Sequence, residues 1–187
     1  MISKLHLKLD EYSHMVASGA FEAIHRKVEL IRGELVEMNP AGPVHNDLID
    51  YLTNWSVRAT ERTKVHIRVQ SSLEFMQLDS CPEPDISWVK ARRYLDSHPT
   101  GADTLLVIEV ADSSVKSDRT DKADLYAEAG IPEYWLVDVQ GKCIYMMREI
   151  VAGGHYGWQQ TAKVGDLASP LAQPTAELNV ADLFGVS

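Results

Sequence analysis

The sequence predicts an α/β protein of the α+β type, in which helices flank a mixed central β-sheet. The first indication is "TLLVIEV" (104–110), an apolar, β-branched-rich run that is typical of a strand buried on both faces. The second is the pair "EYWLVDV" and "CIYMMREI", which flank a turn at Gln140-Gly141 and predict two antiparallel strands. The third is a segment near residue 50 whose apolar residues recur at helical spacing.

The N-terminal part of the chain is predicted to form a helix, a hairpin and a longer helix. We expect the first helix around Leu9 to Ala17 and the hairpin over "KVELIRGELVEM" (27–38). The longer helix follows, and its apolar stripe predicts packing against one face of the sheet rather than a cofactor site. The stripe consists of Val44, Leu48, Leu52, Trp55 and Ala59.

Two strand predictions come next along the chain. "VHIRVQSSLEFM" (65–76) predicts one or two strands, because apolar residues alternate with His66, Arg68 and Gln70 and leave one face in water. Gln70 contacts substrate if that face borders a catalytic pocket, and otherwise belongs to a solvated sheet face. "DISWV" (85–89) predicts a further short strand that opens with an acid.

Two carboxylates in these strands are the first candidates for function. Glu109 interrupts a buried apolar run, and a buried carboxylate needs a cation or several hydrogen-bond donors to offset its lost hydration. A buried salt bridge would explain Glu109 equally well. Asp85 follows Pro84 at the start of its strand, where it is either a second site acid or an ordinary turn residue.

A lysine lies on the element that follows Glu109. "SDRTDKADLYAEAG" predicts an amphipathic helix that ends at Gly130. Asp118, Lys122 and Tyr126 are spaced four apart, so an early start of the helix would place all three on one face. The alternative is a surface ion pair between Asp118 and Lys122.

The remaining part of the chain predicts an edge strand and a loosely structured arm. "YGWQQTA" (156–162) is expected at the edge of the sheet, and "SPLAQPTAELNVADLFG" (169–185) is expected to be irregular until its apolar end. That arm either packs on the body of the protein or mediates a dimer contact.

Composition limits the remaining possibilities. We expect residues 1–187 to form a single domain, because 187 residues that are 45% hydrophobic can bury a substantial core and no repeat divides them. No membrane span is expected, and Cys81 and Cys143 are expected to be free thiols, so we predict a cytoplasmic protein. Glycine-rich phosphate loops, His/Cys metal spacing and Gly-x-Ser-x-Gly turns are absent from the sequence.

The net charge of −9 is unfavourable for attracting a polyanion, although local basic clusters exist. One cluster is Lys90, Arg92 and Arg93, just after the Asp85 strand, and its members are either phosphate contacts or solvated charges. The other cluster, near the end of the long helix, is a weaker candidate and consists of Arg58, Arg62 and Lys64.

Taken together, several motifs resemble the Uma2 family of endonucleases in the PD-(D/E)XK nuclease superfamily. The motifs are "PEPDISWV", "LLVIEVADSS", the Asp118-x-x-x-Lys122 pair and "GIPEYW". Upstream, "KVELIRGELVEMNPAGPVHNDLIDYL" resembles the N-terminal segment of the family, a hairpin with Gly33 at its turn, and "VADLFG" resembles its end. The resemblance covers about residues 9–185 and implies a restriction-endonuclease-like fold.

The resemblance also implies a role for individual residues. Asp85 and Glu109 match the two metal-binding acids, and the backbone carbonyl of Val110 would complete the ligand set. Lys122 matches the catalytic lysine, which many superfamily members carry two residues after the second acid, where this chain has Ala111. Two further residues match family positions: Glu34 matches an additional acid, and His45 matches a histidine whose role is either in the active site or only at the start of a helix. From their spacing alone, Asp118 and Tyr126 are candidates for contacts beside Lys122.

We therefore predict hydrolysis of DNA phosphodiester bonds by a metal-activated water, with Mg²⁺ as the cofactor and Mn²⁺ as its substitute. A homodimer is expected, since two sites could address two strands. Two alternatives remain open: a nuclease-like protein that binds nucleic acid without cutting it, and a nuclease that acts on RNA or on another phosphodiester.

Overall fold

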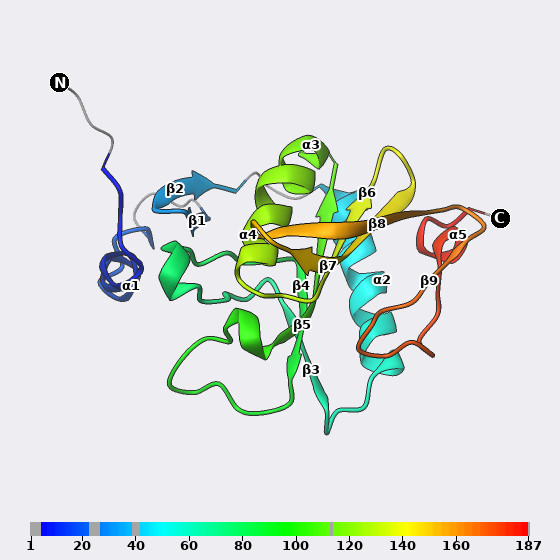
Figure 1. Cartoon of the computed structure of the whole chain (residues 1–187), viewed down its shortest axis with the longest axis horizontal. Helices are drawn as coiled ribbons and strands as arrows, with labels where there is room; N and C mark the ends of the chain where they lie inside the picture. Colours follow the sequence, from blue (N-terminus) through cyan, green and yellow to red (C-terminus); the bar gives the residue numbers. More distant parts are fainter. Residues whose placement is uncertain (1–4, 23–26, 39–41, 113, 187) are drawn as a thin grey trace.

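A mixed six-stranded β-sheet forms the centre of the protein in the computed structural model, which describes residues 5–22, 27–38, 42–112 and 114–186 (Figure 1). Its strands lie in the order β3-β4-β5-β6-β7-β8, and only the β5–β6 pair is parallel. This arrangement confirms the predicted mixed sheet. The strands are β3 (Val65–Val69), β4 (Ile86–Lys90), β5 (Thr104–Ala111), β6 (Glu133–Asp138), β7 (Cys143–Val151) and β8 (His155–Lys163).

The two strands in the middle of the sheet are buried along almost their whole length. In β5 only Leu105 is partly exposed, and every residue of β6 is buried. The prediction of a central strand at "TLLVIEV" is therefore confirmed. Since β5 and β6 are parallel, the chain must cross one face of the sheet between them, and this crossover carries Lys122.

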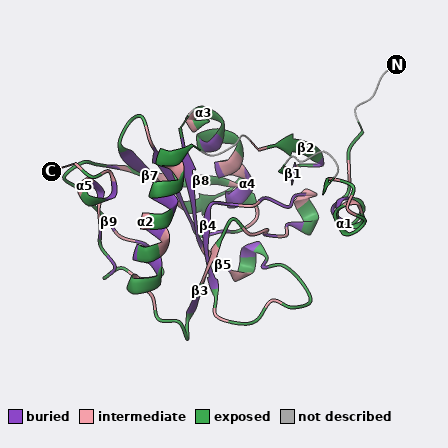
Figure 2. Ribbon diagram, turned by 180° about the vertical axis from the view of Figure 1, so that it is seen from behind, coloured by how far each residue is buried: buried purple, intermediate pink, exposed green. Residues whose placement is uncertain are grey.

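Helix α2 (Pro43–Ala59) covers one face of the sheet (Figure 2). Its Trp55 ring lies 5.5 Å from the ring of Trp88 on β4 and 5.8 Å from that of Trp135 on β6. Of the predicted stripe, Leu48, Leu52 and Trp55 are buried, whereas Val44 is 58% exposed. Val44 lies in the first turn of α2, where it lines an open pocket beside Phe184 instead of meeting the sheet.

The C-terminal arm packs on the body of the protein, which is one of the two alternatives that the sequence left open. Residues 169–177 are turns and irregular backbone, as expected, and the apolar end forms β10 (Leu178–Asn179) and helix α5 (Val180–Leu183). β10 pairs with β9 (Leu167–Ala168), a two-residue strand just before the arm. Leu178, Val180 and Leu183 are buried in the core under α2.

The crossover between β5 and β6 covers the other face. It contains α3 (Val115–Ser117), a π-helical segment (Asp118–Lys122) and α4 (Ala123–Glu128). Leu125 and Tyr126 are fully buried against the sheet. Gly130 ends the helix at φ +83°, as its position after the apolar stripe predicted. The predicted single helix is thus divided by a π-helical segment.

A smaller N-terminal unit packs beside the sheet. It consists of α1 (Leu9–Ala17) and a hairpin of β1 (Val28–Ile31) and β2 (Glu34–Glu37), as predicted. Gly33 forms the turn at φ +77°, and a side chain there would collide with His6. The hairpin joins the main body through a bridge between Leu30 and Cys81.

Three sequence expectations concern smaller features. "VHIRVQSSLEFM" forms only one strand, because after Val69 the chain turns and Glu74 and Phe75 make isolated bridges. Cys81 and Cys143 are buried and free, as expected. Within the described residues, none of the helices has the length and apolar character needed to cross a membrane.

Candidate active site

Asp85 and Glu109 face each other across two neighbouring strands. Asp85 immediately precedes β4, and Glu109 lies near the end of β5. Because Ile86 pairs with Ile108 in antiparallel register, the next residues in each strand, Asp85 and Glu109, are opposite one another. Both are buried, with exposures of 7% and 4%. The sequence placed the two acids in separate strands, and the register brings them together.

Donors on two sides hold Asp85 as an anion. Its Oδ2 accepts a hydrogen bond from the Val110 backbone N–H at 2.9 Å and lies 3.2 Å from Nε2 of His45 in the first turn of α2. Burial by itself would raise the pKa of Asp85, but these two donors outweigh it and the pKa lies below its usual value. The hydrogen bond to Asp85 raises the pKa of His45 in turn.

The pKa of Glu109 is shifted in the opposite direction from that of Asp85, because burial outweighs its donors and raises the pKa to about 7. Its Oε1 accepts hydrogen bonds from the Tyr126 hydroxyl at 2.6 Å and from the Lys122 ammonium at 2.9 Å. Both donors lower the pKa, while the nearby charge of Asp85 raises it. The fully buried Tyr126 hydroxyl fixes this carboxylate in place.

Lys122 and Tyr126 lie four residues apart on the crossover, and both donate a hydrogen bond to Oε1 of Glu109. Lys122 ends the π-helical segment, and Tyr126 lies one turn later in α4. Burial would lower the pKa of Lys122, but Glu109 and a second acid, Glu29, outweigh it, so that the pKa is raised. Lys122 therefore pairs with Glu109 rather than with Asp118.

Asp118 and Gln70 are at the margin of this group. The Asp118 carboxylate bonds the hydroxyl of Ser114, and its backbone carbonyl accepts from Tyr134. It acts on Lys122 only through its charge. Gln70 places its amide nitrogen 3.5 Å from Asp85 Oδ1, at the limit of a hydrogen bond.

Glu29 is the site residue that the sequence analysis missed. It lies on β1 and is fully buried, its Oε1 accepts from the Glu83 backbone N–H at 2.8 Å, and its Oε2 is 4.0 Å from Nζ of Lys122. Glu34, the residue expected to supply this acid, is exposed on β2. Strand alternation could have revealed the difference, because Leu30 faces α1 and its neighbour Glu29 must face the other way.

The carboxylates of these acids have the chemistry to bind a hard cation, and in this structure two of them lie beside the Lys122 ammonium. Among the described residues, no group of three or more His, Cys, Asp or Glu side chains has the arrangement of a metal site. The donor chemistry nevertheless fits: Glu29 and Glu109 flank one lysine, Asp85 lies opposite Glu109, and Oε2 of Glu29 is buried without a hydrogen-bond partner in the described structure. Carboxylate oxygens are the ligands that Mg²⁺ prefers.

The predicted phosphate contacts lie at the far end of β4. Lys90 ends the strand that Asp85 begins, which separates them by about 16 Å at 3.3 Å per residue. Arg92 forms a 2.9 Å ion pair with Asp103 and stacks on the ring of Tyr94. Arg93 is exposed in the same loop. The structure therefore does not bring this cluster to the acids.

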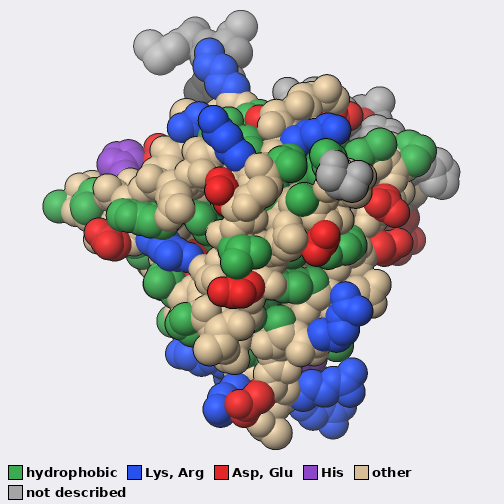
Figure 3. Space-filling view, turned by 90° about the vertical axis from the view of Figure 1, so that its right-hand side faces the viewer, with side chains coloured by type: hydrophobic (Ala, Val, Ile, Leu, Met, Phe, Trp, Pro, Cys, Tyr) green, Lys and Arg blue, Asp and Glu red, His purple; other side chains and the backbone are tan. Residues whose placement is uncertain are grey.

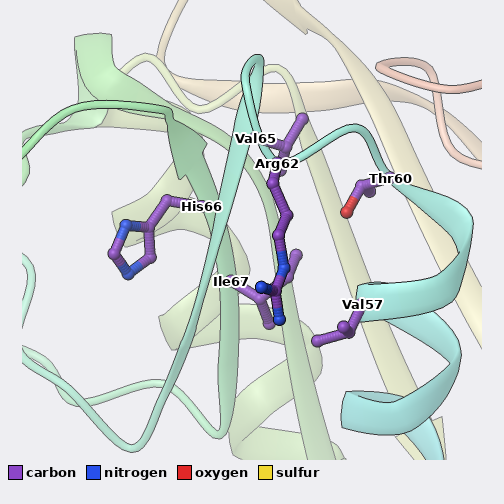
Figure 4. Close-up of a pocket in the computed structure, with 6 residues that line it drawn as sticks. All are labelled: Val57, Thr60, Arg62, Val65, His66 and Ile67. Carbon is purple, nitrogen blue, oxygen red and sulfur yellow. The ribbon is translucent and has the colours of Figure 1, made fainter.

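A pocket at the same end of the sheet lies between α2 and β3 and is likewise remote from the acids. In Figure 4, Arg62 extends between β3 and the end of α2, while His66 points to the other side of β3. Lys and Arg side chains gather at the lower tip of the face in Figure 3. The exposed basic residues of this region are Arg58, Arg62 and Lys64, and the last pairs with Glu61. No buried titratable group of the acid cluster lines the pocket.

Comparison with known proteins places this geometry in context. The Uma2 family model, described as "Putative restriction endonuclease", matches residues 9–181. Among solved structures, the chain is similar to "a putative nuclease belonging to DUF820 from Anabaena variabilis ATCC 29413", with a TM-score of 0.72 and 14% identity over 96% of this chain and 98% of that chain. A search of curated proteins finds no match. The structural likeness shows a shared, nuclease-like fold.

Proposed function

Because the chain belongs to the Uma2 family of restriction-endonuclease-like proteins, we propose that it is a metal-dependent endonuclease that hydrolyses the phosphodiester bonds of DNA. One observation carries the proposal: two buried carboxylates, Asp85 and Glu109, meet across β4 and β5 beside the ammonium of Lys122. Three buried carboxylates, those of Glu29, Asp85 and Glu109, have only Lys122 and His45 as cationic partners. This excess of buried acids supports a site that receives a further cation.

Asp85, Glu109 and the backbone carbonyl of Val110 would hold the metal, and Mg²⁺ with Mn²⁺ as substitute suits this all-oxygen set. When bound, such an ion supplies a Lewis acid that polarises a phosphoryl oxygen and makes water a stronger nucleophile at neutral pH. The Val110 N–H donates to Asp85, which supports a role for the carbonyl of the same residue as a metal ligand.

The other residues orient these ligands and the substrate. His45 would hold the Asp85 carboxylate in one rotamer, and Tyr126 would do the same for Glu109. Lys122 would donate to a non-bridging oxygen of the scissile phosphate, where its positive charge stabilises the charge that develops during hydrolysis. Gln70 and Asp118 remain proposed contacts at the margin of the site.

The basic cluster at the far end of β4 is our candidate for DNA contacts outside the catalytic centre. A duplex that reached from Asp85 to Lys90, Arg92 and Arg93 would extend about 16 Å along β4, or about five base pairs at 3.4 Å each. We propose these three residues as outer phosphate contacts. We further propose that the chain acts as one nuclease domain and as a homodimer, so that each copy cuts one strand.

The test is hydrolysis of defined polymers. Wild-type protein and Asp85→Asn, prepared identically, are incubated with supercoiled plasmid, linear duplex DNA and single-stranded RNA, with Mg²⁺ or with EDTA. We expect nicking and linearisation of DNA by the wild type in Mg²⁺ alone. Cleavage that persists in Asp85→Asn would identify a contaminating nuclease, and cleavage confined to RNA would change the substrate. DNA binding without turnover in Mg²⁺ would favour the non-hydrolytic alternative.

A further inference from the structure

Lys122 lies between two carboxylates that approach it from different elements. Its Nζ is 2.9 Å from Oε1 of Glu109 on β5 and 4.0 Å from Oε2 of Glu29 on β1. The lysine side chain is only 16% exposed, and that of Glu29 is fully buried. The ammonium is therefore the cation that offsets the buried negative charge of the metal-free site.

A metal ion ligated by Glu109 would enter the space next to this ammonium. Two cations at contact distance repel strongly even at the effective dielectric constant of about 20 that suits protein sites. The Lys122 ammonium and a divalent ion therefore compete for the charge of Glu109. Tyr126 shares the same oxygen but carries no charge, so it does not take part in this competition.

Glu29 offers the ammonium a second position. Its Oε2 has no hydrogen-bond partner in the described structure, whereas its Oε1 is held by the Glu83 backbone N–H at 2.8 Å. A buried carboxylate oxygen without a donor is costly. A movement of Nζ by about 1 Å would shorten the 4.0 Å separation to hydrogen-bond length.

We infer that Lys122 alternates between two carboxylates, pairing with Glu109 in the metal-free protein and transferring to Glu29 when a divalent cation binds Asp85 and Glu109. This inference rests on the proposed function. It makes Glu29 a positioning residue, which keeps the ammonium charged and close to the reacting phosphate after metal has displaced it from Glu109. An ammonium has three donors, so a bond to Glu29 leaves two for phosphate oxygens.

The test is a double-mutant cycle on metal affinity, measured by titration calorimetry with Mn²⁺. The proteins are the wild type, Glu29→Gln, Lys122→Met and the double variant, and Lys163→Met on the exposed edge strand β8 is the matched control for loss of one lysine charge. We expect Lys122→Met to bind Mn²⁺ about tenfold more tightly, since the competing cation is gone. Glu29→Gln is expected to weaken binding about fivefold in the wild-type background and less than twofold in the Lys122→Met background.

A second readout is thermal stability, measured without metal and then with Mn²⁺. Thermal unfolding of the metal-free proteins should show Lys122→Met to be less stable than the wild type, with a larger Mn²⁺-induced rise in the unfolding midpoint. If Lys122→Met does not fold, Lys122→Gln replaces it, because its amide can still donate to Glu109. Lys163→Met should match the wild type in both measurements.

Three outcomes overturn the inference. If Lys122→Met binds Mn²⁺ no more tightly than the wild type, the ammonium does not compete with metal. If Glu29→Gln weakens binding equally in both backgrounds, Glu29 is a ligand and not an alternative partner of Lys122. Both results leave the metal-dependent nuclease intact. If the wild type binds no Mn²⁺ and cuts no DNA, the proposed function fails and this inference fails with it.

Discussion

Among the acids of the site, Glu109 is the one whose pKa burial raises to near neutral pH. Burial raises its pKa to about 7, although the Lys122 ammonium and the Tyr126 hydroxyl favour its charged form. Only the carboxylate form binds metal, because the proton and the cation compete for the same oxygens. Metal affinity and cleavage should therefore rise as pH increases through the range that the Glu109 pKa sets.

The first prediction concerns Tyr126, whose hydroxyl lowers the Glu109 pKa by donating to Oε1. Tyr126→Phe removes this donor, which raises the Glu109 pKa, and the midpoint of the pH–rate profile should move to higher pH. Single-turnover cleavage between pH 5.5 and 9 at fixed Mg²⁺ measures it. The control is Tyr156→Phe, because that hydroxyl bonds the Ile131 carbonyl instead of a site acid. An unchanged or lower midpoint would contradict the assignment.

The second prediction concerns His45. Its Nε2 lies 3.2 Å from Asp85 Oδ2, and residues that orient metal ligands typically contribute about 10- to 100-fold to affinity or activity. His45→Ala should reduce cleavage by that factor, and raising the Mg²⁺ concentration should recover part of the loss. If His45→Ala cleaves as fast as the wild type, His45 only begins the helix.

Some residues of the candidate site could be predicted from the sequence and one could not, and the reason is physical. Asp85 and Glu109 could be found from the sequence because a charge at the end of a buried apolar run is conspicuous locally. Glu29 lies in a short hairpin, where alternation indicates that it faces away from Leu30, but its approach to Lys122 depends on how the hairpin docks on the main body through the bridge between Leu30 and Cys81. The family resemblance led to Glu34 instead, which is exposed.

At the scale of elements, the turn before β5 lies in close contact with the end of the crossover. The 3₁₀ turn at Gly101–Asp103, just before β5, packs against the end of α4. A Cβ on Gly101 would come within 1.8 Å of the Ala129 backbone oxygen. Backbone occupies this space, so the clash cannot be relieved by rotating a side chain.

The third prediction follows from this close approach. Gly101→Ala should destabilise the protein by about 2 kcal/mol or more, because the turn and the end of α4 must separate. Urea denaturation at neutral pH measures the free energy of unfolding. Ala102→Ser, which adds one atom to the exposed neighbouring residue, is the control and should change stability by less than about 0.5 kcal/mol. Equal stability of the two variants would contradict this packing.

Attachment of α1 provides the fourth prediction. Asp79 accepts from Lys8 and His6 side chains and from the Leu9 N–H, and these donors lower its pKa to about 2. Because the folded pKa is depressed, this stabilisation is present above the usual value of 3.8 and is lost as pH falls toward about 2. Asp79→Asn should therefore release α1 at neutral pH and speed proteolysis near residue 18. Asp96→Asn, in an exposed loop, is the control, and equal proteolysis rates would contradict the attachment.

Element types were easier to predict than their internal detail. Strong apolar patterns identified α2, β5 and β6, because burial on one or both faces leaves a period in the sequence. The π-helical segment at Asp118–Lys122 was not predicted, since one additional residue per turn leaves the composition unchanged. The short strands β9 and β10 were missed because two-residue strands have no period at all.

For the whole molecule, a net charge of −9 opposes the approach of DNA. Part of this charge is concentrated in Glu29, Asp85 and Glu109, where the proposed function would bring the substrate phosphate closest. A divalent cation at the site would reverse the local repulsion. The protein should therefore depend on metal for binding as well as for hydrolysis.

The fifth prediction tests this dependence. With Ca²⁺, a hard cation that takes oxygen ligands, the Kd for a short duplex should be at least about tenfold lower than in EDTA, equivalent to 1.4 kcal/mol. Fluorescence anisotropy of a labelled duplex at constant ionic strength measures it. Glu109→Gln should lose most of the Ca²⁺ effect. Equal affinity in Ca²⁺ and EDTA would show that DNA does not bind over the acids.

The central claim is that the acid pair on β4 and β5 binds a catalytic metal, and anomalous diffraction from Mn²⁺-soaked crystals tests it most directly. We expect an anomalous peak about 2.0–2.3 Å from carboxylate oxygens of both Asp85 and Glu109, with Lys122 displaced from Glu109. A peak elsewhere, or none at these acids in a preparation that cuts DNA with Mn²⁺, would contradict it.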